Sequence, residues 1–296
     1  MAEDLRVDLF CIGAPKCGTT WLAACLDEHP EAAVSDPKET NFYAPRTGFR
    51  RAPRPGPTMD QSTYRACFRP ATVRADFSVN MLHNGTEVAS IVAKDWPHAK
   101  LLLVLREPVQ RAYSQYWNAR RNHPQAKVPS SFLEALDIPE FRYQSEYAAQ
   151  LVSWSHHFAS DRFLFVLDHQ LRDDPHAVIR HLYGWLGLDD GFVPPSLERR
   201  INAAHATGPL GRAAKQLAAW VERRGGRSVV QRLADTKAWQ TLRRLDQRDK
   251  PYPPLTPEEA LAWWDHLEPD LEQLATTWGV DVAPWRAQAE AWAGAS

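Results

Sequence analysis

A segment close to the N-terminus combines the residue types that bind an anion. It reads Gly-Ala-Pro-Lys-Cys-Gly-Thr-Thr-Trp over residues 13–21 and directly follows the apolar run 9–12. We expect a strand, a turn and a helix here, with the unpaired N–H groups and the positive dipole end of the helix facing a ligand. Gly18 lets the backbone approach that ligand closely, and Thr19 and Thr20 add hydroxyl donors. The pattern predicts a phosphate-binding loop.

The lysine of this loop stands in an unusual place. Gly13 and Gly18 have the spacing of a Walker A loop, but Thr19 takes the position of the lysine that follows the second glycine there. Lys16 lies inside the loop instead. We expect its ammonium group to contact the bridging oxygen of a leaving phosphate, whereas a kinase lysine reaches the terminal phosphates.

A second candidate anion site follows another apolar run, at residues 101–105. Arg106 ends this run, and Ser114 comes eight residues later in a predicted helix that continues to about Asn118. The planar guanidinium group of arginine donates two parallel hydrogen bonds to a phosphate. Arg111, between the two, fits a solvated side chain equally well. Two phosphate sites at the carboxyl ends of parallel strands predict a nucleotide with phosphates at both ends of its ribose.

These sites need a scaffold that brings strand ends together. Apolar runs at residues 9–12, 101–105 and 163–167 each lead through a polar turn into a helical stretch, and residues 72–78 predict a fourth strand. The turn after the third run is expected over residues 168–175. Continuous apolar runs that alternate with helices indicate a parallel sheet covered on both faces. We therefore predict an α/β fold, with a central parallel sheet flanked by helices.

The chain of 296 residues is predicted to form a single domain, 1–296. Polar, proline-containing loops are expected at 45–58 and 121–131, either as substrate walls or as plain solvated loops. A basic helical segment at 199–250 either attracts an anionic nucleotide or presents a solvated face. Residues 256–278 begin with Thr-Pro-Glu-Glu and predict a closing helix.

Composition and charge exclude several classes of protein. The formal net charge is −1, so the chain is not a nucleic-acid binder by charge. Its four cysteines lack Cys-x-x-Cys spacing and histidine partners, so we expect neither a metal site nor a disulfide framework. Free thiols suit a cytoplasmic location. The N-terminus does not resemble a signal peptide, and no apolar run is long enough to span a membrane.

The two phosphate segments together resemble those of the PAPS-dependent sulfotransferase family, where PAPS is 3′-phosphoadenosine 5′-phosphosulfate. The 5′-phosphosulfate loop of that family, Pro-Lys-x-Gly-Thr-Thr, is matched by residues 15–20. Its 3′-phosphate element, an arginine followed by a serine at the same separation, is matched by Arg106 and Ser114. Residues 36–43 resemble the Lys-Glu-x-x-Phe-Phe segment of bacterial and heparan-sulfate-type members, in which the glutamate is the catalytic base.

The resemblance implies a P-loop-like nucleotide-binding fold and a sulfotransferase that uses PAPS and releases PAP (3′-phosphoadenosine 5′-phosphate). It covers most of the chain, since residues 147–154 and 255–264 also resemble helices of the family. It implies that Glu39 is the general base and that Lys16 stabilises the leaving phosphate, without a metal ion. The residues that it assigns to the cofactor are Lys16, Cys17, Gly18, Thr19, Thr20, Trp21, Arg106 and Ser114.

Two parts of the family pattern are altered in this chain. The family segment Glu-x-Ser-Pro-x-Tyr corresponds to residues 75–80, where Asp76 and Ser78 are plausible equivalents. The loop that closes over the cofactor is not recognisable, although Arg212 or Lys215 could serve there.

The expected acceptor is a small molecule, glycoside or natural product with a hydroxyl or amine. The expected source is bacterial. Neither nucleic acid nor a membrane is an expected partner.

Two other readings remain open from the residues. A P-loop kinase of a small metabolite would use Asp168, after the run 163–167, to hold magnesium. The chain could also be a non-catalytic nucleotide-binding or scaffold protein that uses the phosphate loop for binding alone. In that case, Glu39→Ala would leave every activity of the protein unchanged.

Overall fold

The structure is a computed structural model that describes residues 6–45, 59–122, 128–198 and 252–295, together with the backbone of two short strands, β6 (His205–Thr207) and β7 (Gln247–Asp249). The chain divides into two compact units. The first holds residues 1–115, 129–201 and 255–296, and the second holds 116–128 and 202–254. In the second unit, β6 and β7 form an antiparallel pair. A single domain over the whole chain stays a prediction.

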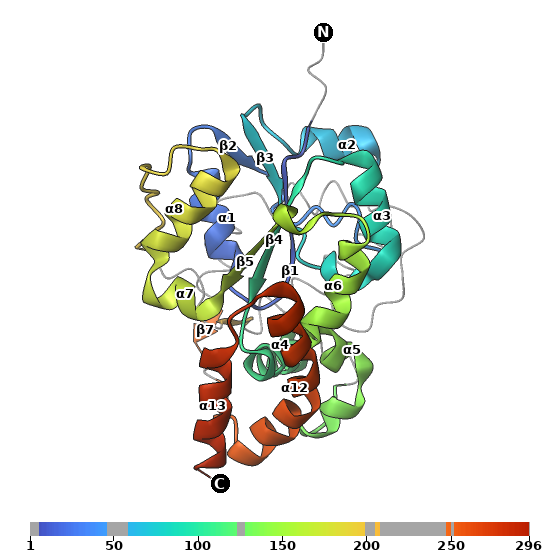
Figure 1. Cartoon of the computed structure of the whole chain (residues 1–296), viewed down its shortest axis with the longest axis vertical. Coiled ribbons are helices and arrows are strands. Elements are labelled where there is room, and N and C mark those ends of the chain that lie inside the picture. Colours follow the sequence, from blue (N-terminus) through green and yellow to red (C-terminus); the bar gives the residue numbers. More distant parts are fainter. Residues whose placement is uncertain are drawn as a thin grey trace. The chain divides into compact units, whose positions relative to one another are not determined.

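The first unit is built on a parallel sheet, as the sequence predicts. The strands are β1 (Leu9–Gly13), β2 (Ala32–Val34), β3 (Val73–Asp76), β4 (Lys100–Leu105) and β5 (Phe163–Leu167). Their order across the sheet is β2-β3-β1-β4-β5, and every neighbouring pair is parallel. The central strand β1 pairs with β3 on one edge and β4 on the other (Figure 1).

The strand order indicates where a ligand is expected to bind. After β1, the chain builds β2 and β3 on one side of it and then crosses to build β4 and β5 on the other. In open α/β sheets, ligands bind at the carboxyl ends of the strands where this change of direction occurs. Because β1 and β4 are parallel neighbours, the segments that follow them begin side by side at this edge of the sheet.

Helices cover both faces of this sheet. Figure 1 shows α1 and α8 on one side, with α3 and α6 on the other. The α-helices are α1 (Thr19–Asp27), α2 (Gln61–Ala66), α3 (Gly85–Asp95), α4 (Pro108–Asn122), α5 (Pro139–Arg142), α6 (Tyr147–Ser155), α7 (Asp168–Asp173), α8 (Pro175–Leu186), α12 (Pro257–Trp278) and α13 (Ala283–Ala293). Short 3-10 turns are η1 (Leu82–Asn84), η2 (Glu134–Asp137), η3 (Tyr143–Ser145) and η4 (Ser160–Arg162).

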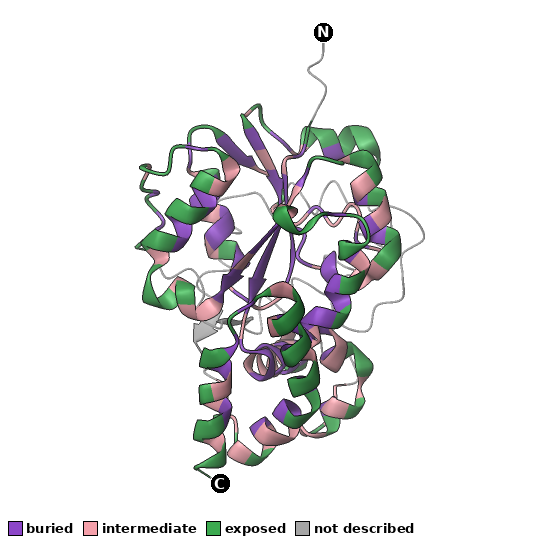
Figure 2. Ribbon diagram, in the orientation of Figure 1, coloured by how far each residue is buried: buried purple, intermediate pink, exposed green. Residues whose placement is uncertain are grey.

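The core lies along the strands, because parallel strands covered on both faces must be apolar throughout. Residues 9–13 of β1 and 101–105 of β4 are all buried (Figure 2). The predicted closing helix is present as α12, with Thr256 and Glu259 forming a capping box at its start. Its buried Trp263 donates its indole N–H to the carbonyl oxygen of Phe132 at 3.0 Å. Among the described residues, no helix is long and apolar enough to cross a membrane.

Several elements differ from the sequence prediction. The turn expected over residues 168–175 is mostly the helix α7, and the strand β2 and the helix α13 were not predicted. α4 extends to Asn122, so the expected loop 121–131 begins within a helix. Most of the expected loop 45–58 and the helices predicted within 199–250 lie outside the described residues.

Candidate active site

The predicted phosphate loop joins β1 to α1. A side chain at Gly13 would place its Cβ 2.8 Å from Leu82 Cδ2, so the last residue of β1 must be glycine for this packing. The next residue, Ala14, donates its N–H to the carbonyl oxygen of Val104 at 2.9 Å, which fastens the loop to β4. Gly18 adopts the left-handed conformation, with φ 90°, that glycine tolerates best. The loop is thereby held against the strand that carries Arg106.

The first turn of α1 is arranged to receive an anion. Gly18 precedes this helix and has no side chain to cap it, and the first turn contains no acidic residue. The N–H groups at the start of α1 therefore keep the partial positive charge of a helix N-terminus. Thr20 is exposed, whereas the buried Thr19 uses its hydroxyl oxygen to accept a hydrogen bond from Lys38. This agrees with the expected loop–helix geometry.

Lys16 and Cys17 sit in a positively charged environment, in which Cys17 is buried and Lys16 is partly buried. Burial lowers the pKa of the Lys16 ammonium group, and the charge of Arg106 lowers it further. Lys16 and Arg106 follow the paired strands β1 and β4, so both lie at the same edge of the sheet. Burial raises the pKa of the Cys17 thiol to about 11, against the opposing charges of Arg111 and Arg106. Cys17 is therefore a neutral thiol at physiological pH and has its backbone alone to offer an anion.

The second predicted phosphate element combines a partly exposed arginine with a capped helix. The Arg106 Nη2 donates to Gln110 Oε1 at 2.9 Å, and its Nε lies 4.0 Å from Asp168 Oδ2. Tyr147, on α6, donates its hydroxyl to the Arg106 carbonyl oxygen at 2.9 Å and so fixes the end of β4. Ser114 is half-buried on α4, within the helix that Arg106 precedes.

The N-terminus of α4 is not open in the way that the N-terminus of α1 is. Glu107 accepts hydrogen bonds from the N–H of Val109 at 2.9 Å and of Gln110 at 2.7 Å. Arg111 is fully buried, and it donates to Ser145 Oγ at 2.7 Å and to the Phe141 carbonyl oxygen. The solvated alternative for Arg111 is therefore wrong, because α5 and η3 cover it.

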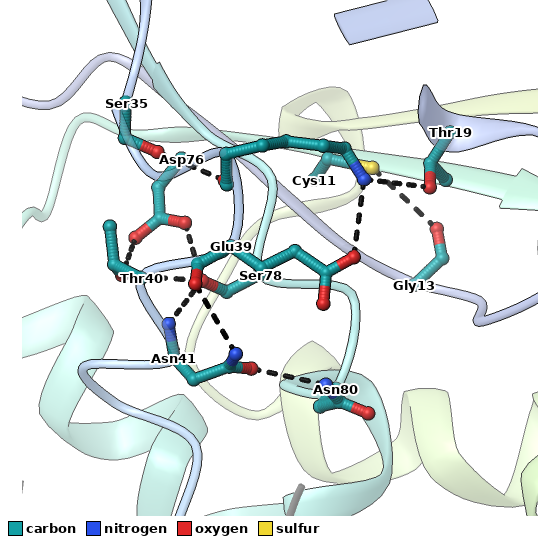
Figure 3. Close-up of polar contacts among 11 residues, drawn as sticks. Cys11, Gly13, Thr19, Ser35, Glu39, Thr40, Asn41, Asp76, Ser78 and Asn80 are labelled. Atoms are coloured by element: carbon teal, nitrogen blue, oxygen red, sulfur yellow. Dashed lines mark hydrogen bonds and ion pairs between the residues drawn. The ribbon is translucent and has the colours of Figure 1, made fainter. Parts of the chain in front are cut away.

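The expected base, Glu39, lies beside the phosphate loop. Lys38 Nζ is 3.3 Å from Glu39 Oε1 and donates to Thr19 Oγ1 at 3.2 Å (Figure 3). Glu39 keeps 39% of its side chain exposed, so its second oxygen can meet a substrate. The structure thus brings the carboxylate after β2 to the start of α1.

A buried hydrogen-bond network holds the Glu39 segment in place. Asp76, at the end of β3, accepts from Thr40 Oγ1 at 2.7 Å, from Ser78 Oγ at 2.5 Å and from Tyr64 Oη at 3.2 Å. The Ser78 hydroxyl oxygen also accepts the Asn41 N–H at 2.8 Å (Figure 3). Burial raises the pKa of Asp76, and these hydroxyl donors partly oppose that rise. Asp76 and Ser78 therefore fix the backbone that directly follows Glu39.

Comparison with known proteins bears on what this arrangement does. The family model described as "Sulfotransferase domain" matches residues 6–203, which is most of the chain and includes the phosphate loop, Glu39 and the Arg106 element. The chain belongs to the sulfotransferase family. This confirms the family and the transferase class that the sequence resemblance implies.

Curated relatives match the same part of this sulfotransferase. It is 26% identical over 201 residues to bifunctional heparan sulfate N-deacetylase/N-sulfotransferase 1 of Caenorhabditis elegans, covering 62% of this chain. It is 28% identical over 198 residues to bifunctional heparan sulfate N-deacetylase/N-sulfotransferase 3 of Homo sapiens, covering 60% of this chain. The chain spans only 22% of the length of each of these relatives.

A solved structure supports the fold of this sulfotransferase. The sulfotransferase from Alicyclobacillus acidocaldarius superposes with a TM-score of 0.56 at 24% sequence identity. The match covers 80% of this chain and 100% of that one. The P-loop-like nucleotide-binding fold predicted from the sequence is therefore confirmed.

Membership of the sulfotransferase family also bears on the kinase alternative. Asp168, the residue that a kinase would use for magnesium, faces two arginines in this structure, Arg106 at 4.0 Å and Arg172 at 3.8 Å. The family model that matches the chain is that of a sulfotransferase domain, so it favours the sulfotransferase over the kinase alternative.

Three further residues that the sequence singled out remain, together with one that it did not. Trp21 uses its indole N–H to bind the Ser196 carbonyl oxygen at 3.0 Å, so its polar atom serves the fold. Arg212 and Lys215 lie outside the described residues. Sequence reasoning passed over Lys38, although it stands directly before the expected base, because adjacent charges are usually solvated.

Proposed function

We propose that this sulfotransferase moves the sulfuryl group from PAPS to a hydroxyl or amine of a carbohydrate or small-molecule acceptor and releases PAP. The observation that carries the proposal is that the two segments with candidate anion-binding residues follow the carboxyl ends of the neighbouring strands β1 and β4. A nucleotide with phosphates on both sides of its ribose needs such a pair of sites.

The residues divide between the two ends of the donor. The 5′-phosphosulfate meets the start of α1 through the backbone of Cys17 and Gly18 and the hydroxyls of Thr19 and Thr20, with Lys16 close by. The 3′-phosphate meets the guanidinium group of Arg106 and the hydroxyl of Ser114. Trp21 is the remaining residue assigned to the cofactor, and we assign its ring to one wall of the phosphate loop.

The chemistry follows from this division. Glu39 takes the proton from the acceptor, whose oxygen or nitrogen then forms a bond to sulfur. The bond between sulfur and the 5′-phosphate oxygen breaks, and PAP keeps the electron pair. Lys16 and the N–H groups of the loop stabilise the negative charge that grows on that oxygen. These steps draw on no metal ion, and equal turnover with and without a chelator would agree with that proposal.

The names of the relatives favour a carbohydrate among the possible acceptors, since they are called heparan sulfate N-sulfotransferases. We also propose a cytoplasmic location in a bacterium and no nucleic-acid partner. All four cysteines of the chain are free thiols, as a reducing compartment keeps them. The small net charge gives no attraction to nucleic acid.

A thermal-shift panel tests the proposal without knowledge of the acceptor. The purified chain is heated with PAP, ADP or ATP, each with and without magnesium. We expect PAP to raise the melting temperature more than ADP or ATP and to do so without magnesium, because bound ligand stabilises by mass action. Stabilisation by ATP with magnesium but not by PAP would overturn the proposal.

A variant of the base tests the catalytic assignment. Glu39→Gln keeps the size and polarity of the side chain but cannot take a proton. We expect PAP affinity to stay within about twofold, while turnover falls by roughly 10²–10⁴-fold. Transfer at the wild-type rate in this variant would move the base elsewhere.

A further inference from the structure

Lys38 occupies the space between the phosphate loop and the expected base. Its ammonium group donates to Thr19 Oγ1 at 3.2 Å, at the first residue of α1, and lies 3.3 Å from Glu39 Oε1. The side chain is 23% exposed, so it is neither a freely solvated lysine nor a buried one. It joins two segments that are separated in sequence and that the proposed reaction must bring together.

The backbone around Lys38 is fixed on both sides. Ser35 donates its hydroxyl to the Lys38 carbonyl oxygen at 3.0 Å. On the other side, Thr40 bonds to Asp76 at 2.7 Å and the Asn41 N–H bonds to Ser78 at 2.8 Å. A lysine anchored in this way can direct its ammonium group to one place, whereas a lysine on a free loop spreads its charge over many positions. The Phe77 ring, 5.8 Å from Nζ, adds an aromatic face beneath the charge.

The position suits the sulfuryl group better than either phosphate. The start of α1 and Lys16 serve the 5′-phosphate, and Arg106 serves the 3′-phosphate. The sulfuryl group must lie between the 5′-phosphate and the acceptor, and the acceptor must reach Glu39 to lose its proton. Lys38 Nζ lies between the start of α1, which binds the 5′-phosphate, and Glu39, which receives the acceptor proton. The oxygens of the sulfuryl group are expected in the same place.

We infer that Lys38 binds the sulfuryl oxygens of the donor and exchanges its ion pair with Glu39 for them. The inference rests on the proposed function. In the free protein, the ammonium group holds Glu39 against the loop. When the donor binds, the ammonium group turns to the sulfuryl group, so that the Glu39 carboxylate is released to accept the proton of the acceptor. The positive charge then stays beside the sulfuryl oxygens as the group passes to the acceptor.

The inference predicts a difference between two ligands that differ by the sulfuryl group alone. Dissociation constants of PAPS and PAP are measured by calorimetry for the wild type and for Lys38→Met and Lys38→Arg, without acceptor. We expect Lys38→Met to weaken PAPS by roughly 10–100-fold, the size of a lost charge-assisted hydrogen bond, and PAP by less than about twofold. Lys38→Arg keeps the charge and should recover part of the PAPS affinity.

The controls separate this inference from the proposed function and from simple structural damage. Lys94→Met removes an exposed lysine at the end of α3 and should leave both constants unchanged. Equal PAPS affinity in Lys38→Met and wild type would overturn the inference. So would an equal loss for PAPS and PAP, which would mean that Lys38 only supports the loop. A wild type that binds neither ligand would instead overturn the proposed function itself.

Discussion

Two strand–helix junctions of this protein lie at the same edge of the sheet, but the N-termini of their helices differ in whether their N–H groups are capped. At the β1–α1 junction, the helix begins after a glycine and its first turn carries no acid. At the β4–α4 junction, Glu107 accepts the N–H groups of Val109 and Gln110. The first junction can therefore bind an anion with its backbone. At the second junction, the backbone donors are already hydrogen-bonded to Glu107.

Under the proposed function, one architecture yields two kinds of anion site. Because Glu107 already accepts the first N–H groups of α4, recognition there depends on the side chain of Arg106, which follows the end of β4. Backbone recognition at α1 tolerates a change of side chains, but it requires the conformation that Gly18 provides. Substitutions at the two junctions should then have different effects on turnover and on binding.

The largest expected effect is a loss of turnover at the first junction. Lys16→Met removes the charge that stabilises the leaving phosphate, so we expect kcat at saturating PAPS to fall by roughly 10²–10³-fold. The PAP dissociation constant should change far less, because the backbone donors of α1 remain. Steady-state kinetics alongside calorimetry make the test, and a variant that loses affinity and keeps kcat would reverse the roles of the two junctions.

The next effect is a pH dependence of the free energy of unfolding that arises from Glu107, at the β4–α4 junction. Burial raises the pKa of Glu107 to about 7 from an ordinary 4.5, so the folded protein holds this proton more tightly than the unfolded chain. The associated stability is present below pH 4.5 and is lost as the pH rises through 7, by up to about 3 kcal/mol.

Urea unfolding of wild type and Glu107→Gln at acidic, neutral and alkaline pH measures this effect. We expect the free energy of unfolding of the wild type to fall relative to that of the variant between pH 4.5 and pH 8, since glutamine does not titrate. A constant difference between the two proteins over that range would show that Glu107 is ionised throughout.

A smaller effect separates the 3′-phosphate from the rest of the nucleotide. Arg106→Met should raise the dissociation constant of PAP by roughly 10–100-fold, because a charge-assisted hydrogen bond is lost. AMP, which lacks the 3′-phosphate, should bind the variant as it binds the wild type. An equal loss for both nucleotides would place Arg106 at the 5′ end and remove the distinction between the junctions.

The smallest effect concerns the carboxylate that competes for Arg106. Asp168 lies 4.0 Å from the guanidinium group, with 15% of its side chain exposed. Asp168→Asn removes that competitor, so PAP should bind a few-fold more tightly, in keeping with the value of about 1 kcal/mol or less for partly exposed ion pairs. Weaker PAP binding in this variant would mean that Asp168 orients Arg106 for the ligand.

The sequence predicted the parts of the fold that are built from strong, continuous patterns. The apolar runs of β1, β4 and β5 were visible because strands buried on both faces contain little else. The loop between β1 and α1 was visible because glycine and lysine at these spacings have few other uses. β2 was missed because Ala32–Val34 is a short strand with no periodicity, and α7 because its acidic start reads as a turn.

The parts of the site that were missed depend on contacts across the chain. Arg111 carries no sign in the sequence that α5 and η3 will bury it. Lys38 reads as an ordinary charge next to Glu39, and only folding brings it to Thr19. The role of Asp76 depends on partners before it and after it in the chain, Thr40 and Ser78. Spacing along a sequence cannot report such pairings.

The placement of β4 beside β1 has a consequence for biosynthesis. Phe10 in β1 pairs with Leu101 in β4, so one edge of the first strand lacks its partner until the ribosome has made β2, β3 and the helices between them. During that interval, an apolar edge strand is open to pairing with other nascent chains. The same delay means that no fragment ending before β4 contains both halves of the proposed nucleotide site. The yield of folded protein on overexpression should therefore rise with slower translation or added chaperones, because the species that aggregates is the incomplete nascent chain.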